Sequence, residues 1–440
     1  MTPILRNRIA QIRHGQVPKG YRLTRCGIVP GDWTELCLGD IYTERNEPGN
    51  EDLPLLTVSI HSGVSDGEVD EEQLPKKVKR IADKTQYKRA ASGDLAFNMM
   101  RAWQGAIGTV RTEGMVSPAY IVAVPNDKVD PLFMDYYVKM ERTVQYIHRQ
   151  SYGVTDFRLR LYWDSFVSIP CVLPPLAEQR KIAKILAAQD RVIELLNRKI
   201  EQLNLLKKYY QRKMFPQHGK NEPEVRFSGF TEAWERKRLD DVFSEYTEKG
   251  HSELPALTIV QGGGTIKRDE SERKLHYDKN YLSNYKVVDK GDFIVHLRSF
   301  EGGLEVATTR GLISPAYNVF RGKAIDPRFY YAYFRSPEFI HGDLTPHVYG
   351  IRDGRSIDID GLKSIRIPYA PLAEQKAVGN FIATLDNQIA LHQRKHDEEV
   401  LKKKALMQLL LTGIVRVSVK GGDVGKRSSK MPHLRGGGIL

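Results

Sequence analysis

The chain has 440 residues, of which 41% are hydrophobic and 28% are charged, and its formal net charge is +13. This length predicts two to four domains, because a single hydrophobic core stops growing near ~250–300 residues. The sequence has no run of roughly 18 apolar residues for a membrane span, no secretory signal and only three scattered cysteines, so we expect a cytoplasmic protein without a disulfide framework or a zinc site.

The first half of the chain begins with a basic segment, residues 1–25, which holds six basic side chains and no acidic one. Residues 26–174 mix short β-type runs such as "DLAFNMM" and "AYIVAV" with Gly, Asn, Asp and Pro breaks, and they contain one amphipathic helical stretch. This pattern predicts an α+β globular domain, because strands and helices do not alternate as they do around a parallel sheet. Residues 175–215 then predict one long helix that begins at Pro175 and carries apolar side chains at 3-4 spacing.

The second half has the same organisation. Residues 216–370 predict a linker and a second α+β domain, and residues 371–413 predict a second long helix that ends at Gly413. Residues 414–440 are rich in Gly, Ser and basic side chains, so we expect a disordered tail there. At ~1.5 Å per residue, each long helix is expected to form a rod of about 60 Å.

The two halves repeat each other in sequence. The word PLAEQ stands at Pro175 and again at Pro371, "VSPAYIVAV" is matched by "ISPAYNVFR", and "YGVTD" is matched by "YGIRD", always in the same order. This order indicates a tandem duplication. Each long helix carries an apolar seam that must be buried, so we expect the two helices to pair as an antiparallel coiled coil with one globular domain at each end. The alternative is that each helix closes the core of its own domain.

The positive charge does not lie on the two globular segments. Residues 26–174 hold 16 basic and 21 acidic side chains, and residues 216–370 hold 23 of each. If these segments bind a polyanion, they must do so through local patches.

The sequence carries no strong catalytic motif. HExxH, GxxxxGK[ST], GxGxxG and an NPPY-like adenine methyltransferase motif are all missing from it. One spacing, Glu224 followed by Glu235 and Lys237, resembles a nuclease metal site, since two carboxylates and a lysine can hold a divalent ion and polarise water. The first half has no equivalent trio, so a stand-alone metal-dependent DNA nuclease is only the alternative hypothesis.

A duplicated pair of domains on a rigid rod suits the recognition of two different short elements with a fixed gap between them. Duplex DNA repeats every ~34 Å, so two readers spaced along it meet the same groove only at set separations. A protein–protein scaffold is a third hypothesis with the same design.

Four stretches of the sequence resemble one known family. "PLAEQRKIAKILAAQDRVIELLNRKIEQLNLLKKYYQRKMFP" and "PLAEQKAVGNFIATLDNQIALHQRKHDEEVLKKKALMQLLLTGIVRV" resemble the central and C-terminal helical regions of type I restriction–modification specificity subunits. "KGYRLTRCGIVPGDWTELCLGDI" and "EPEVRFSGFTEAWERKRLDDVF" resemble the segments that open their two target recognition domains. The resemblance covers residues 19–417, although the second PLAEQ lacks the Pro-Pro that precedes the first.

The resemblance implies a role and a set of partners. It implies a non-catalytic, sequence-specific DNA-binding subunit that recognises a bipartite target, one half per recognition domain, with the helical rod setting the spacer. It implies double-stranded DNA, two methyltransferase subunits and restriction translocase–nuclease subunits as partners. S-adenosylmethionine, ATP and Mg²⁺ are then used by those partners, and no cofactor is expected in this chain.

Candidate DNA contacts lie mainly in loops that match between the two halves. Base readout needs polar side chains on elements that enter a groove, whereas phosphate contacts need only positive charge. The loops "NMMRAWQGAIG" and "VHLRSFEGG" place Arg101, Trp103 and Gln104 approximately opposite Arg298, Ser299 and Phe300, although Trp103 and Phe300 are equally expected in the core. The basic run at residues 76–80 is also typical of a solvated surface. The predicted DNA-contacting residues are Lys76, Lys77, Arg80, Arg101, Gln104, Tyr152, Arg158, Arg160, His296, Arg298, Ser299, Tyr349, Arg352 and Arg355.

Overall fold

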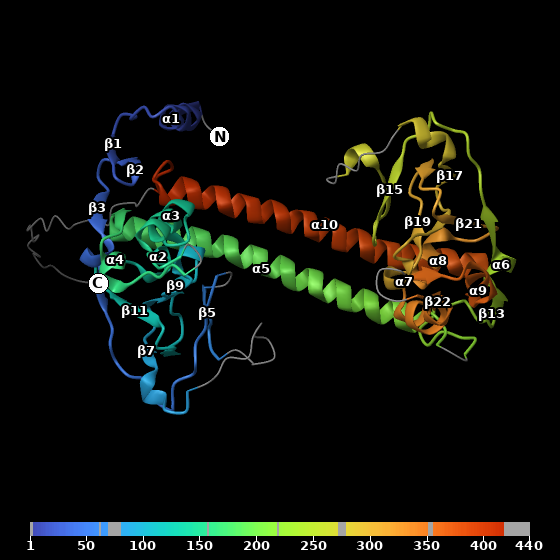
Figure 1. The fold of residues 1–440 in the computed structure, drawn as a ribbon, viewed down its shortest axis with the longest axis horizontal. Coiled ribbons are helices and arrows are strands. Elements are labelled where there is room, and N and C mark those ends of the chain that lie inside the picture. Colours follow the sequence, from blue (N-terminus) through green and yellow to red (C-terminus); the bar gives the residue numbers. More distant parts are fainter. Residues whose placement is uncertain are drawn as a thin grey trace, which may run out of the picture. The chain divides into compact units, whose positions relative to one another are not determined.

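The computed structural model describes residues 3–60, 63–68, 81–155, 158–217, 220–271, 279–350 and 355–417. The chain divides into two compact units, drawn in Figure 1. Unit 1 comprises Met1–Glu194 together with Glu398–Leu440, and unit 2 comprises Leu195–Asp397. Two long helices, α5 (Leu176–Lys213) and α10 (Leu372–Leu411), each contribute one part to each unit.

Unit 1 is a mixture of short strands and short helices. Its helices are α1 (Pro3–Arg13), α2 (Pro131–Tyr137), α3 (Glu141–Gln150) and α4 (Trp163–Val167), with the 3-10 turns η1 (Leu38–Asp40), η3 (Lys84–Gln86) and η4 (Ala102–Gln104). Its strands are β1 (Tyr21–Thr24), β2 (Gly27–Pro30), β3 (Thr34–Cys37), β4 (Tyr42–Glu44), β5 (Val58–Ser59), β6 (Gly63–Val64), β7 (Lys88–Ala90), β8 (Leu95–Asn98), β9 (Ile107–Thr109), β10 (Gly114–Val116), β11 (Tyr120–Pro125) and β12 (Pro170–Leu173).

A four-stranded antiparallel sheet with the order β4-β11-β8-β9 forms the centre of unit 1. Successive side chains of a strand point to opposite faces, and both faces of this sheet are buried. Phe97 belongs to the main core and stacks on Phe166 of α4 with ring centroids 4.9 Å apart, whereas its neighbour Ala96 belongs to a second, smaller cluster. The strands therefore read as continuous apolar runs, as the sequence "DLAFNMM" shows.

Unit 2 repeats this topology. Its four-stranded sheet has the order β14-β21-β18-β19, formed by β14 (Phe243–Tyr246), β21 (Asn318–Gly322), β18 (Phe293–Val295) and β19 (Glu305–Val306). Its other strands are β13 (Glu235–Arg238), β15 (Leu257–Val260), β16 (Gly264–Lys267), β17 (Lys286–Val288), β20 (Gly311–Ile313), β22 (Val348–Tyr349), β23 (Ser356–Ile357) and β24 (Arg366–Tyr369). Its helical elements are α6 (Leu239–Val242), α7 (Ser299–Gly302), α8 (Pro327–Phe334), α9 (Ile359–Ser364), the π-helix η7 (Glu338–Leu344), and the 3-10 turns η5 (Arg268–Glu270), η6 (Lys279–Asn284) and η8 (Thr345–His347). The predicted α+β class and the duplication are confirmed.

The same sequence signal starts the helix that follows the central sheet in each unit. Asp130 precedes α2 and accepts a hydrogen bond from the Phe133 N–H at 2.9 Å, while Asp326 precedes α8 and accepts from the Arg328 N–H at 2.9 Å. A proline follows each aspartate at the first helical position, where its missing N–H has no partner to lose.

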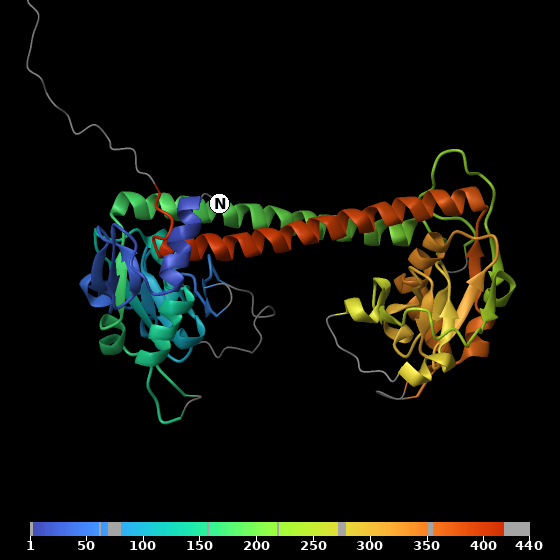
Figure 2. The same ribbon diagram turned by 90° about the horizontal axis from the view of Figure 1, so that it is seen from above.

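The helices α5 and α10 run antiparallel to each other within each unit (Figures 1 and 2). In unit 1, Lys403 forms an ion pair with Asp190 at 2.5 Å. In unit 2, Lys207 forms an ion pair with Asp386 at 2.5 Å. Later positions of α5 thus meet earlier positions of α10, and the predicted antiparallel pairing is confirmed.

The glutamine of the repeated PLAEQ motif has the same structural role in both units. The Gln179 carbonyl accepts from the Asp130 N–H at 2.9 Å, and the Gln375 carbonyl accepts from the Asp326 N–H at 3.0 Å. Both glutamines are buried. Each one ties the first turn of a long helix to the residue that starts α2 or α8, so the amide fixes the angle at which the long helix leaves its globular domain.

The glutamate of the same word holds a buried ion pair. Glu374 is fully buried and accepts from Arg226 at 2.6 and 2.8 Å and from the Trp234 indole N–H at 2.8 Å. Glu178 accepts from Arg416 at 2.9 and 2.8 Å. Arg226 lies in the segment after α5 and Arg416 in the segment after α10, so the chain that leaves each long helix is anchored to the start of the other one.

The two ends of the chain meet in unit 1. Tyr21 donates to the Gly413 carbonyl at 2.8 Å, and the hairpin of β1 and β2 crosses the border expected at residue 25. Val415 and Val417 pack against the main core. Residues 414–417 are therefore not part of a disordered tail, contrary to the expectation, and residues 418–440 lie outside the described residues. No helix in the described ranges is both long and apolar enough to cross a membrane.

Candidate DNA interface

The first predicted loop of unit 1 follows β8 and presents two polar side chains. The Asn98 side chain accepts from the Met100 N–H at 3.0 Å and so closes the turn before Arg101. Arg101 precedes η4 and is exposed, as is Gln104. Trp103 is half-buried against the core and donates its indole N–H to the Met100 carbonyl at 3.0 Å, so it supports the loop from below.

The second predicted loop of unit 1 lies directly beside the first. Tyr152 and Arg160 bridge each other through backbone hydrogen bonds of 3.1 and 3.0 Å, and the next N–H, that of Leu161, donates to the Met99 carbonyl at 2.9 Å. Gly153 is required in this bridge, because a Cβ there would lie 2.2 Å from the Arg158 carbonyl oxygen. The structure thus brings Arg101 and Gln104 next to the loop that carries Tyr152, Arg158 and Arg160, all of them exposed.

Unit 2 builds its first loop with the same turn. The His296 ring Nδ1 accepts from the Arg298 N–H at 3.3 Å, in the way that Asn98 accepts from Met100. This geometry places Arg298 opposite Met100 and Ser299 opposite Arg101, one residue away from the alignment expected from the sequence. Arg298 is exposed.

Ser299 does not fit the prediction that it contacts DNA. Its side chain is fully buried, and its hydroxyl accepts from the His296 N–H at 2.9 Å. The hydroxyl is used to close the turn that begins α7, so it is not available to a duplex.

The second loop of unit 2 also lies beside the first. The strands β22 and β23 pair in the register Tyr349 with Ser356. The Arg355 guanidinium lies 5.7 Å from the centre of the Phe300 ring, so it links this hairpin to the α7 loop. Tyr349 is 59% exposed. The predicted residues Lys76, Lys77, Arg80 and Arg352 lie outside the described residues.

Comparisons with known proteins show which family the chain resembles. Residues 30–205 match the sequence model of the type I restriction modification DNA specificity domain. Over 331 residues the chain is 29% identical to the type I restriction enzyme MjaVIII specificity subunit of Methanocaldococcus jannaschii, an alignment that covers 69% of this chain and 75% of that protein. The chain is similar to the type I restriction–modification specificity subunits.

Two solved structures share the fold. An alignment with the S subunit of the type I restriction–modification system from M. genitalium covers 86% of this chain and 96% of that one, at a TM-score of 0.53 and 12% identity. A second structure comes from work on the complex assembly and conformational transition of the type I R-M system. Its alignment covers 88% of this chain and 99% of that one, at a TM-score of 0.51 and 17% identity.

The exposed arginines of the loops carry free positive charge. Within the described ranges, Arg101, Arg158, Arg160 and Arg298 form no ion pair and no side-chain hydrogen bond. Arg321 of unit 2 behaves differently, because it forms an ion pair with Asp292 at 2.7 Å. Free guanidinium groups on adjacent loops are suited to phosphate oxygens and to the guanine edge.

His296 is neutral near pH 7 and holds an unused donor. Burial and the nearby Arg335 lower the pKa of His296 to about 4. Because Nδ1 accepts from Arg298, the proton of the neutral ring is assigned to Nε2. Nε2 is buried, and within the described residues it has no hydrogen-bond partner. His296 therefore contributes no charge for a phosphate contact, and it suits the base of the loop better than its tip.

Sequence reasoning missed the apolar tips of these loops. Val154 is 97% exposed, Leu297 is 68% exposed and Met100 is 46% exposed. Apolar side chains in the major groove contact the thymine methyl group. The sequence signal was an apolar residue inside a polar loop. Such a residue does not by itself show whether its side chain is exposed or buried.

The residues of the alternative nuclease hypothesis are held in two separate ion pairs. Glu224 forms an ion pair with Lys213, which lowers the pKa of Glu224, and Glu235 pairs with Lys237 on β13 at 3.1 Å. In the part of the chain that the structure describes, no group of three His, Cys, Asp or Glu side chains is arranged to hold a metal ion.

Proposed function

We propose that this specificity chain selects a bipartite duplex DNA target, with the paired loops of each unit contacting one half. The observation that carries the proposal is the repeated construction of the loops. In both units a turn after the third strand of the sheet order lies against a short hairpin, and both carry exposed arginines that have no ion partner among the described residues. The two sets of side chains differ, so the two half-sites differ in sequence. The α5–α10 pair sets the gap between them.

The partners follow from the family. We propose that the chain assembles with methyltransferase subunits, two per chain, and with restriction translocase–nuclease subunits. S-adenosylmethionine, ATP and Mg²⁺ are then used by these partners. The specificity chain supplies binding energy and position, and it performs no reaction of its own.

Salt-dependent binding tests the role of the loops. The chain, assembled with its methyltransferase subunits, is titrated into labelled target duplex at several salt concentrations. Each arginine that contacts a phosphate adds roughly 1 to the slope of log K against log salt. Arg158→Ala and Arg160→Ala should each reduce this slope, whereas Arg310→Ala, which removes an exposed arginine already paired with Asp289, should not.

A control separates this function from the nuclease hypothesis. The purified chain alone is incubated with Mg²⁺ and plasmid DNA. No cutting is expected, and cutting by the chain without other subunits would contradict the proposal. Binding that does not change with salt concentration would favour a protein scaffold instead.

A further inference from the structure

The two units share a second surface, formed by a short strand pair and the start of the helix after α2 or α8. In unit 1, β3 pairs with β12 and places Glu35 opposite Val172. In unit 2, β13 pairs with β24 in the same way and places Arg236 opposite Pro368. Arg142 of α3 and Glu338 of η7 are equivalent positions. Arg142 follows Pro131, the first residue of α2, by the same number of residues as Glu338 follows Pro327, the first residue of α8. We call these two surfaces the unit 1 face and the unit 2 face.

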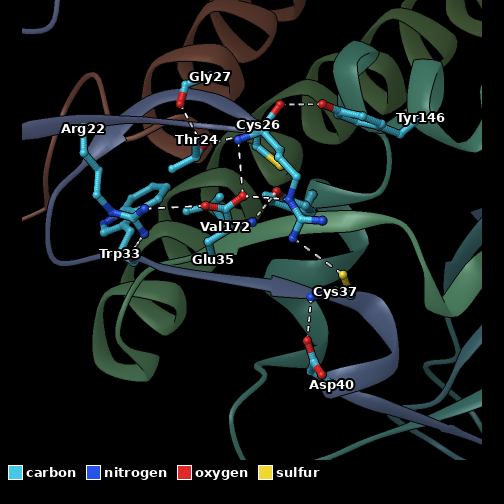
Figure 3. Close-up of polar contacts among 12 residues, drawn as sticks. Arg22, Thr24, Cys26, Gly27, Trp33, Glu35, Cys37, Asp40, Tyr146 and Val172 are labelled. Atoms are coloured by element: carbon cyan, nitrogen blue, oxygen red, sulfur yellow. Dashed lines mark hydrogen bonds and ion pairs between the residues drawn. The ribbon is translucent and has the colours of Figure 1, made fainter.

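In unit 1 the face is covered by the chain itself. Figure 3 shows the tip of the β1–β2 hairpin on this face: the Tyr146 hydroxyl donates to the Arg25 carbonyl at 2.5 Å. The Arg25 N–H donates to the Glu35 carboxylate at 3.2 Å, and the Arg25 side chain forms an ion pair with the same carboxylate at 3.0 Å. The unit 1 face therefore holds a polypeptide turn through one carbonyl, one N–H and one charged side chain.

The turn fits the unit 1 face closely. Cys26 is 5% exposed and packs with Val29, Trp33 and Val172, and burial raises the pKa of its thiol to about 11. Gly27 has φ +92° and lies so close to Arg142 that a Cβ would be 2.5 Å from a guanidinium nitrogen. The remaining cavity is about 10 Å³, which is room for roughly one water molecule.

In unit 2 the described residues leave the face open. Within residues 214–217 and 220–234, the described part of the chain between α5 and β13, there is no strand and so no counterpart of the β1–β2 hairpin. A cavity of about 250 Å³ remains there. It is lined by Pro216, Gln217, Arg236, Tyr333, Glu338 and Asp343.

Two side chains that line this cavity each have a buried polar atom that lacks a partner within the described residues: Arg236 has the donor Nε and Glu338 has the acceptor Oε2. The rest of each side chain is used: Arg236 Nη1 donates to the Arg366 carbonyl at 3.4 Å, and Glu338 Oε1 lies 3.9 Å from Arg212. A buried donor or acceptor left unsatisfied is destabilising, so an occupant that satisfies both is favoured.

We propose that the unit 2 face binds a turn of a second polypeptide chain that carries an acidic side chain. The carboxylate of that turn pairs with Arg236, and a backbone N–H of the turn donates to Glu338. A comparison of the two faces indicates the charge of the bound turn. Glu35 of the unit 1 face pairs with Arg25, and Arg236 takes the place of Glu35 in unit 2. The turn that binds the unit 2 face should therefore carry a negative charge. A free anion would meet the carboxylates of Glu338 and Asp343, and a metal ion would meet the Arg236 guanidinium, so neither suits the site.

A designed peptide tests the proposal without knowledge of the partner. The probe is a cyclised peptide with the sequence of residues 21–30, YRLTRCGIVP, in which Arg25→Glu is introduced, and its binding to the full chain is measured by calorimetry. The glutamate peptide should bind one site per chain, and the unchanged peptide should bind at least about tenfold more weakly. Arg236→Glu should reverse this preference, and Glu338→Gln should weaken both peptides.

Two controls keep the result decisive. Arg310→Glu changes the net charge of unit 2 by the same amount at an exposed position outside the face and should leave both affinities unchanged. The circular dichroism spectrum and melting curve of each variant first show whether it is folded. If Arg236→Glu is not folded, Glu338→Gln serves as the test. Failure of the glutamate peptide to bind up to about 1 mM, or binding that Arg236→Glu and Glu338→Gln both leave unchanged, would overturn the proposal.

Discussion

Replacing Glu374 with glutamine should strongly destabilise unit 2, because it removes the charge that Arg226 and Trp234 share. Breaking a buried ion pair by removing one partner typically costs about 3–5 kcal/mol, since the other charge stays buried and uncompensated. Glutamine keeps one acceptor for the three donated hydrogen bonds, and the Arg226 side chain is 16% exposed, so water can reach it in part. We therefore expect about 3 kcal/mol, the lower end of that range.

The equivalent change in unit 1 should cost less. When Glu178 is replaced by glutamine, Arg416 keeps its ion pair with Asp32 at 2.7 Å, and its side chain is 37% exposed. The guanidinium is not left alone, so we expect a loss of about 1.5–2 kcal/mol, at the low end of the range for hydrogen bonds to charged groups. The two variants of the same repeated motif should thus lose measurably different amounts of unfolding free energy.

Denaturant unfolding followed by peptide-resolved hydrogen exchange measures each unit separately. For a unit of this size, 3 kcal/mol corresponds to a fall of about 6–12 °C in melting temperature. Glu235→Gln is the matched control, because Glu235 is exposed on β13 and, within the described residues, pairs only with Lys237. It should change stability by less than about 0.5 kcal/mol. Equal losses for the Glu374 and Glu178 variants, or a Glu374 variant as stable as the parent chain, would refute the assignment of these anchors.

Three further predictions concern the loops and the helices. His296 has a folded-state pKa lowered to about 4, so between pH 6.5 and 4 the unfolded chain binds a proton that folded unit 2 does not; stability should fall as pH falls through this window. His296→Asn, which supplies the side chain of the equivalent turn in unit 1, should flatten that slope in urea unfolding, and an unchanged slope would exclude His296 as its source. Arg101→Ala should weaken binding to one half-site and Arg298→Ala to the other, measured with duplexes altered in one half at a time; equal loss for both halves contradicts the assignment. Inserting one heptad in both α5 and α10 should lengthen the preferred gap by about 3 base pairs, whereas insertion in one helix alone should abolish pairing, as selection of bound duplexes would show.

Much of the architecture is encoded in local signals that a single sequence displays. The Asp-Pro pairs at Asp130 and Asp326 start equivalent helices, and the 3-4 spacing of apolar residues gives the long helices within two residues of their bounds. The order of repeated blocks was sufficient to predict two units of one topology. Each of these signals acts between residues close in the chain, where side-chain chemistry determines the backbone.

The parts that the sequence left open depend on contacts between distant residues. Glu374 and Arg226 are 148 positions apart, and no local pattern links them. Ser299 has the composition of a DNA contact, yet it is buried because its hydroxyl closes the turn below Arg298. The one-residue shift of Arg298 relative to Arg101 was likewise set by the hydrogen bond of His296, which substitutes a ring nitrogen for the amide oxygen of Asn98.

The central claim is that each unit contacts its own half of one DNA target, and sequencing of methylated adenines in a host tests it most directly. Hosts with and without the chain are compared, in the presence of the partner subunits. We predict methylation that depends on the chain, at sites with two short elements separated by a constant gap, and a double variant Arg298→Ala, Arg355→Ala that relaxes only one element. A single continuous element, or loss of both elements in that variant, would contradict the claim.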